Sequence, residues 1–264
     1  MNTRPSADKS LAAYVLLVFV LSIPFWLIGM IPSALPANLP LSAFMFVCPM
    51  IAASILVYRS SGWDGVRQLL GRAVDYGRIR NKTWYLPALL LQPVFMLTEY
   101  GLLRLMDVPV PGLRFPVLVV AASSLVFLIA AVCEEIGWSG HATEPLQERT
   151  NALWAGIILG AVWGIWHALP YFQAPDANTP PWVAWQIAST VANRVLIVWI
   201  YNNAGRSVFA ASLLHATYNI SFLVLLPGDA SYYDPSITFI LTAITAVVVT
   251  IVWGPGTLAR SPSA

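Results

Sequence analysis

Eight long apolar runs, separated by short polar connections, dominate this chain. A helix that crosses about 30 Å of hydrocarbon needs roughly 20 mostly apolar residues at about 1.5 Å per residue, and each run is close to that length. We therefore predict an all-α fold: a polytopic membrane helix bundle of about eight transmembrane helices, forming a single domain over residues 1–264. The candidate spans are residues 11–31, 39–58, 84–106, 115–138, 152–172, 182–201, 207–226 and 236–254.

The composition agrees with an integral protein of the plasma or inner membrane, embedded in the lipid bilayer. Of the 264 residues, 58% are hydrophobic and only 10% are charged, whereas soluble domains carry about 25% charged residues. The first run is longer than the apolar core of a signal peptide, so we expect an uncleaved first helix. Cleavage near Ala34 or Ala37 is the alternative.

The basic residues are distributed unevenly over the two sides of this predicted bundle. Eight spans place both termini on one side of the membrane. The loops on the opposite side contain a single basic residue, Arg114. Because Lys and Arg accumulate in cytoplasmic loops, we predict that both termini are cytoplasmic. The formal charge of +2 then reflects topology, and no nucleic-acid partner is indicated. The basic side carries Arg4, Lys9, Arg59, Arg67, Arg72, Arg78, Arg80, Lys82, Arg149, Arg206 and Arg260.

The longest polar stretch, residues 59–83, has two interpretations. Val66, Leu69, Leu70 and Ala73 stand at helical spacing among arginines, which suits a short amphipathic helix on anionic lipid. A solvated loop that obeys the positive-inside rule is the alternative.

Acidic, imidazole and amide side chains interrupt the apolar runs. Glu134 and Glu135 lie in the fourth run. Two of the three histidines, His167 and His215, lie in the fifth and seventh runs, with Asn219 one turn after His215. A charged side chain in a bilayer costs at least about 2.5–3.5 kcal/mol, so such groups persist mainly where they face a protein interior or a wet cavity. A single histidine or asparagine can be a contact between helices. Together, these residues indicate a functional site.

The spacing of these residues places them at matching depths. If the fourth helix continues almost to the fifth, which begins near Asn151, the two form an antiparallel hairpin with Glu134 and His167 equidistant from the turn. His215 and Asn219 are four residues apart and share a helix face. We expect the four groups to converge on one cavity open to the cytoplasm, with the Glu134 carboxylate about 4–7 Å from an imidazole nitrogen of His167.

Gly156, Gly160 and Gly164 follow one another at four-residue spacing in the fifth run. Small residues at this spacing let membrane helices approach closely. His167 follows Gly160 by seven residues and lies within about 20° of the same stripe. We predict that this face packs against another helix.

Three short segments resemble the motifs of the CAAX protease and bacteriocin-processing family, abbreviated CPBP or Abi. The family motifs are Glu-Glu-x-x-x-Arg, Phe-x-x-x-His and His-x-x-x-Asn/Asp. The corresponding segments are residues 134–140 (EEIGWSG), 163–167 (WGIWH) and 215–219 (HATYN), in the family's order and each in an apolar run. The resemblance covers about residues 125–221, which include the stretch 199–203 (WIYNN) that also looks typical.

The resemblance implies an intramembrane endopeptidase with eight helices. Its substrate would be a membrane peptide or protein, and the eukaryotic branch removes the last three residues of prenylated CAAX proteins. By this likeness Glu134, helped by His167, would be the general base for a water molecule. His215 and Asn219 would polarise the scissile carbonyl and hold the oxyanion. Buried donors aimed at an oxyanion are worth about 2.7–4 kcal/mol each, so this assignment is physically reasonable.

Two positions depart from the family motifs. Trp163 replaces phenylalanine, which we regard as a minor change, and Ser139 replaces arginine. The family's arginine lies four residues after the second acid, on the same helix face, where it would neutralise that acid. Glu135 has only a hydroxyl at that place, so it is either protonated or paired with another cation. Arg194, inside the sixth run, is central enough, and we predict an interhelical Glu135–Arg194 pair.

The residues leave the participation of a metal open. His167, His215 and Glu134 with an open fourth position would suit catalytic zinc. No His-Glu-x-x-His helix is present, however. We favour metal-free activation of water and expect no cofactor, with a zinc metalloprotease as the alternative.

Two other functional classes are alternatives to a protease. Buried acids and histidines also build the proton relays of transporters, but the two halves of this chain show no internal symmetry. A catalytically idle relative that binds a membrane peptide, in an immunity or scaffold role, is supported by Ser139 in place of arginine.

Overall fold

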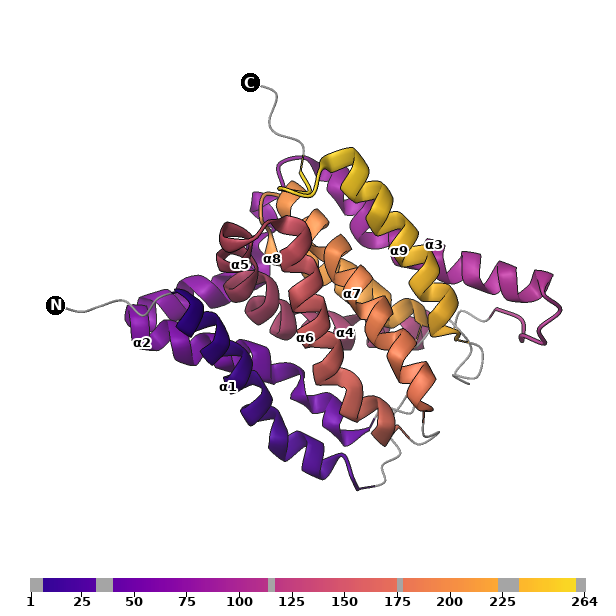
Figure 1. The fold of residues 1–264 in the computed structure, drawn as a ribbon, viewed down its shortest axis with the longest axis horizontal. Helices are drawn as coiled ribbons and strands as arrows, with labels where there is room; N and C mark the ends of the chain where they lie inside the picture. Colours follow the sequence, from indigo (N-terminus) through magenta and orange to yellow (C-terminus); the bar gives the residue numbers. More distant parts are fainter. Residues whose placement is uncertain (1–6, 32–39, 114–116, 175–177, 223–232, 260–264) are drawn as a thin grey trace.

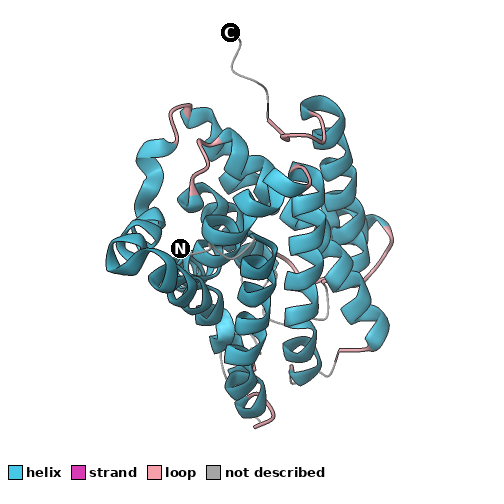
Figure 2. Cartoon of the chain, turned by 60° about the vertical axis from the view of Figure 1, so that its left-hand side comes forward, coloured by secondary structure: helices cyan, strands magenta, loops and turns pink. Residues whose placement is uncertain are grey.

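The computed structural model describes residues 7–31, 40–113, 117–174, 178–222 and 233–259. All regular structure in these ranges is helical (Figure 2), so the all-α prediction is confirmed. Ala34, Ala37 and Arg114 lie outside the described residues. The α-helices are α1 Ala7–Ile28, α2 Cys48–Gly71, α3 Tyr85–Leu105, α4 Val117–Gly137, α5 Glu144–Arg149, α6 Ala152–Gln173, α7 Pro180–Asn203, α8 Val208–Ile220 and α9 Pro235–Trp253. Shorter segments are the 3₁₀ turns η2 Leu41–Val47, η3 Arg72–Arg78 and η4 Lys82–Trp84, and the π-helical η5 Trp138–Thr143.

Seven helical segments of the described chain are long and apolar enough to cross a membrane. They correspond to seven of the eight predicted spans, and the helical membrane bundle is confirmed. The remaining predicted span, residues 207–226, contains the 13-residue helix α8, while residues 223–226 lie outside the described part. The eighth span therefore stays a prediction.

The turn between α5 and α6 lies just before residue 152, as predicted from the equal spacing of Glu134 and His167 about it. α5 ends at Arg149, and the Asn151 side chain accepts the backbone N–H of Trp154 at 2.9 Å, capping α6. An N-terminal cap of this kind satisfies a donor that the helix leaves open. The two arms of the expected hairpin separate, however. α4 packs mainly on α8 and α2, and α6 runs along α7 (Figure 1).

The glycine stripe of α6 lies against α7, as predicted. A Cβ atom added to Gly160 would approach the Cα atom of Val191 to 2.7 Å, and one added to Gly156 would approach the Cα atom of Val195 to 3.0 Å. Gly164 meets Ile187 in the same way. The absence of side chains at these positions lets the two backbones come together, and this contact fixes α7 beside the glutamates of α4.

The polar stretch 59–83 is helical at its start, as the amphipathic-helix interpretation predicts and the solvated loop does not, while the contact with anionic lipid stays a prediction. α2 turns at Gly62, where φ is 64°, and continues to Gly71 before η3 begins. Val66 and Leu69 are buried, whereas Leu70 is exposed. The apolar face thus packs on the protein, with Leu69 in the main core.

The ends of four helices are joined on the side that carries the basic loops. The backbone N–H groups of Ala152 and Leu153, at the start of α6, donate to carbonyls that follow α9. Asn203, at the end of α7, donates to the carbonyl of Leu258 at 2.7 Å. Asp75 of η3 accepts from Ser207, at the start of α8, at 2.6 Å. The orientation of this side toward the cytoplasm stays a prediction.

Candidate active site

The two adjacent glutamates lie at the buried C-terminal end of α4. Glu134 is 5% exposed and Glu135 is fully buried. The chain continues without a break into the π-helical segment η5, and π-helical turns within α-helices are frequent at functional sites. Because neighbouring residues of a helix point about 100° apart, the two carboxylates face different partners.

Glu135 forms the predicted ion pair with Arg194 of α7. The two terminal guanidinium nitrogens lie 2.7 Å from Oε2 and 2.9 Å from Oε1, and both side chains are fully buried. A fork of two parallel bonds is the geometry of a guanidinium on an ionised carboxylate. Arg194 therefore takes the place of the missing arginine, and a protonated, unpaired Glu135 is not what the structure contains.

The same carboxylate holds two further side chains. Ser139 of η5 donates its hydroxyl to Oε2 of Glu135. The Nδ1 atom of His215 lies 3.0 Å from Oε1 of Glu135. Because an ionised carboxylate only accepts hydrogen bonds, this imidazole must carry a proton on Nδ1. Its Nε2 atom is then available to contact a substrate.

Glu134 makes a single hydrogen bond within the described chain. The indole N–H of Trp163 donates to its Oε2 atom at 2.8 Å. The other oxygen, Oε1, accepts nothing from the described residues. A carboxylate oxygen without a protein donor can accept a proton or bind water, as a general base must.

His167 follows Trp163 by one turn on α6. Its Nδ1 atom lies 3.0 Å from the carbonyl oxygen of Trp163, and because a carbonyl only accepts, Nδ1 must donate. The Nε2 atom of the neutral ring is then a free acceptor. Glu134 and His167 thus share one neighbour, Trp163. Their separation of about 4–7 Å, and a cavity open to the cytoplasm, stay predictions.

Asn219 lies on α8 one turn after His215, as its spacing requires. Its side chain is half-buried and forms no hydrogen bond with any described residue. The amide N–H₂ is therefore available as a donor beside the imidazole of His215.

The replacement of phenylalanine by Trp163 adds a hydrogen bond to the candidate base, which our interpretation of a minor change did not anticipate. Trp163 is buried, its indole N–H binds Glu134, and its ring lies edge-on to His215 with the centroids 4.8 Å apart. Phenylalanine lacks the N–H group and could not make this bond. The identity of residue 163 was the available signal, but the direction of its indole depends on how the helices pack.

Metal-free activation of water and the zinc alternative both stay predictions. Among the described residues, no three His, Cys, Asp or Glu side chains gather as metal ligands. We therefore derive no step through a metal.

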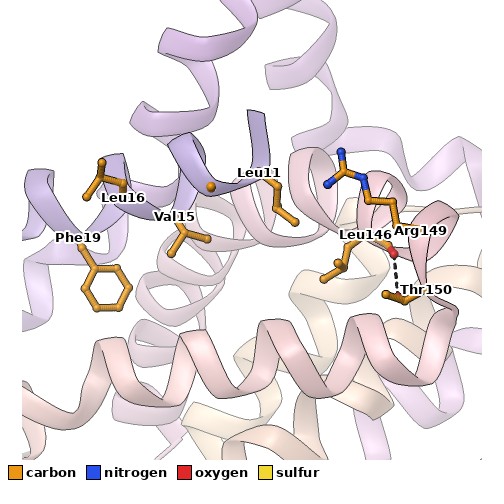
Figure 3. Close-up of a pocket in the computed structure, with 8 residues that line it drawn as sticks. Leu11, Val15, Leu16, Phe19, Leu146, Arg149 and Thr150 are labelled. Carbon is orange, nitrogen blue, oxygen red and sulfur yellow. Dashed lines mark hydrogen bonds between the residues drawn. The ribbon is translucent and has the colours of Figure 1, made fainter. Parts of the chain in front are cut away.

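Two surface hollows lie apart from these side chains. An apolar groove between α1 and the α5–α6 turn is lined by Leu11, Val15, Phe19 and Leu146 and ends at Arg149 (Figure 3). It contains none of the candidate catalytic residues. A second, more polar hollow borders η5 on the side that carries the basic loops, with Arg72, Gly140, His141, Glu144 and Arg206 among its lining residues.

Comparisons with known proteins agree with the three motifs. A family model described as a Rce1-like type II CAAX prenyl endopeptidase matches residues 116–221. CAAX prenyl protease 2 of Methanococcus maripaludis is 24% identical over 209 residues, which cover 75% of this chain and 77% of that protein. Over these residues the chain is similar to CAAX prenyl endopeptidases. The resemblance to CAAX proteases is thereby confirmed.

The Rce1-like match covers the helices that build the site. It begins one residue before α4 and ends at residue 221, just after α8. All five candidate catalytic residues, Glu134, Glu135, His167, His215 and Asn219, fall inside it, together with Arg194 of α7.

Proposed function

We propose that this protein is an intramembrane endopeptidase of the CAAX type, which hydrolyses a peptide bond of a lipidated membrane peptide or protein. The observation that carries the proposal is the free Oε1 atom of Glu134, a buried acid whose other oxygen is held by Trp163. The likeness to CAAX prenyl endopeptidases supplies the substrate class.

Glu134 activates the attacking water in this proposal. Its Oε1 atom accepts a proton from water while the water oxygen forms a bond to the scissile carbonyl carbon. The Nε2 atom of His167, which its tautomer leaves unprotonated, helps to orient the water. The proton then passes from Glu134 to the leaving amine as the carbon–nitrogen bond breaks. A positioned general base contributes about 10²–10⁴-fold in rate.

His215 and Asn219 hold the negative charge that develops on the carbonyl oxygen. Asn219 donates from its free amide. To donate from Nε2 as well, His215 must carry both ring protons, with Nδ1–H directed at the Glu135 carboxylate 3.0 Å away. Glu135 is then a positioning group, since it fixes the direction of the ring without touching substrate. Each such donor to the oxyanion lowers the barrier by about 2.7–4 kcal/mol.

The idle-binder alternative loses its main support. It rested on the missing arginine of the first motif, and Arg194 supplies a guanidinium to Glu135 in its place. We therefore favour the protease and treat the binder as the outcome of a negative assay.

A cleavage assay tests the proposal. The purified protein in detergent is incubated with a farnesylated CAAX peptide and with the same peptide lacking the lipid, and the products are identified by mass spectrometry. We expect cleavage of the farnesylated peptide, undiminished by a chelator.

Glu134→Gln is the matched control, because it keeps the shape of the side chain and removes the base. It should lower the rate about 10²–10⁴-fold while leaving the melting temperature and peptide binding intact. Folded wild-type protein that binds the lipidated peptides but cleaves none of them would establish the idle binder instead.

A further inference from the structure

Trp163 contacts most of the charged and imidazole groups of the site. Its indole N–H donates to Glu134 at 2.8 Å. The guanidinium carbon of Arg194 lies 4.4 Å from the centroid of its ring, which is a cation–π contact. The ring is edge-on to His215 and to His167, with centroids 4.8 Å and 5.6 Å away.

These contacts leave the indole little freedom. Arg194 is itself held by two bonds to Glu135, and His215 by one, so two neighbours of the ring are fixed. A fixed ring gives its N–H a fixed direction. Since that N–H is the only described donor to Glu134, Trp163 determines which way the carboxylate turns.

We propose that Trp163 is a positioning residue, which holds Oε2 of Glu134 so that Oε1 faces the attacking water. The inference rests on the proposed function and names a role that the motif resemblance does not supply, since phenylalanine cannot donate this bond. Buried tryptophans usually find some acceptor. Here the acceptor is the candidate base, and that base has no other described partner.

Trp166 provides a matched comparison in the same helix. Its indole is fully buried and donates to the hydroxyl of Ser22 at 2.7 Å, an equivalent bond to a neutral acceptor, and its ring, like that of Trp163, lies edge-on to His167. Trp166→Phe and Trp163→Phe remove the same atoms from comparable surroundings. A difference in kcat between the two variants therefore shows the effect of losing the hydrogen bond to Glu134 rather than the one to Ser22.

The kinetic test compares these two variants on the farnesylated peptide. Trp163→Phe should lower kcat about 10- to 100-fold with KM changed less than about threefold, because the loss falls on a hydrogen bond to a charged group. Trp166→Phe should lower kcat less than about threefold. If Trp163→Phe does not fold, benzothienylalanine at position 163 keeps the ring shape and lacks only the N–H donor.

A spectroscopic measurement separates this inference from the proposed function. Infrared difference spectra of wild type against Trp163→Phe should contain a shifted glutamate carboxylate band, and the band should vanish when both proteins also carry Glu134→Gln. This readout needs no substrate, so it tests the positioning role even if no peptide is cleaved. An unchanged carboxylate band, or a kcat for Trp163→Phe equal to that of Trp166→Phe, overturns the inference.

Discussion

At the scale of single residues, Glu135 is the centre on which the site is built. Arg194 of α7, His215 of α8 and Ser139 of η5 all bind it, and its side chain is fully buried. A buried charge is tolerated only when it is paired and hydrogen-bonded, and here partners come from two other helices. The carboxylate thus holds helices together and directs one imidazole.

Removing the cation from this pair should be costly. Arg194→Ala leaves the Glu135 carboxylate buried and unpaired, which typically destabilises a protein by about 3–5 kcal/mol. We expect a lower melting temperature in detergent and reduced cleavage. Ser139→Arg in the Arg194→Ala background should restore part of both, because it returns a guanidinium to the same carboxylate.

Arg67 offers the control for this experiment. It also pairs with an acid, Asp64 at 3.5 Å, but both side chains are largely exposed. Exposed pairs contribute about 0–1 kcal/mol, so Arg67→Ala should leave stability and cleavage nearly unchanged. Equal effects of the two arginine variants would contradict the buried-pair account.

At the scale of elements, the close contact of α6 with α7 sets the position of Arg194. A Cβ atom added to Gly160 would lie 3.0 Å from the Cβ atom of Arg194 and 2.7 Å from the Cα atom of Val191. The second contact is with backbone, which cannot move aside as a flexible side chain can. The helices themselves would have to separate.

Even the smallest side chain should therefore disturb this interface. Gly160→Ala should destabilise the protein by about 1–3 kcal/mol through overpacking and lower the cleavage rate by shifting Arg194 from Glu135. A Cβ atom added to Gly101 of α3 would meet no described atom within 4 Å, so Gly101→Ala should be neutral or stabilising by up to about 1 kcal/mol. Thermal unfolding of the two variants in detergent checks this, and equal melting temperatures would rule out the steric explanation.

The sequence predicted where the helices lie along the chain better than it predicted which helices pack together. Apolar runs, the turn before α6 and the glycine stripe follow from local chemistry, and each was predicted. The depth and charge of Glu135 and Arg194 also predicted their pairing. The bend at Gly62, the π-helical η5 and the bond from Trp163 to Glu134 depend on how helices pack, which periodicity does not reveal.

At the scale of the whole molecule, one end of the bundle is tied together by polar contacts. Arg72 of η3 donates to the carbonyl of Gly140 at 2.8 Å, to the hydroxyl of Tyr201 at 2.8 Å and to the carbonyl of Arg206 at 2.7 Å. These bonds connect η3, η5, α7 and the residues just before α8. Together with the contacts of Asp75 and Asn203, they make this end a continuous polar layer.

We predict that this polar end faces the cytoplasm. In a variant with Cys48 and Cys133 replaced by alanine, a cysteine at Ser61 should react with a membrane-impermeant maleimide only in inside-out vesicles. A cysteine at Asp107, just beyond the opposite end of α3, should react in intact cells. The reverse pattern of labelling would invert the topology that the basic residues indicate.

The cation that neutralises Glu135 comes from 59 residues along the chain, whereas the family's first motif supplies it from the position of Ser139, only four residues away. A guanidinium can neutralise the carboxylate from either position, so we predict that the two positions vary together among homologues. Homologues that lack arginine four residues after the second glutamate should carry a basic residue in the helix corresponding to α7, and those that keep the arginine should be free to lose it. A sequence search that demands the complete first motif will miss chains that carry the pairing found here, and a search for either arrangement will recover them.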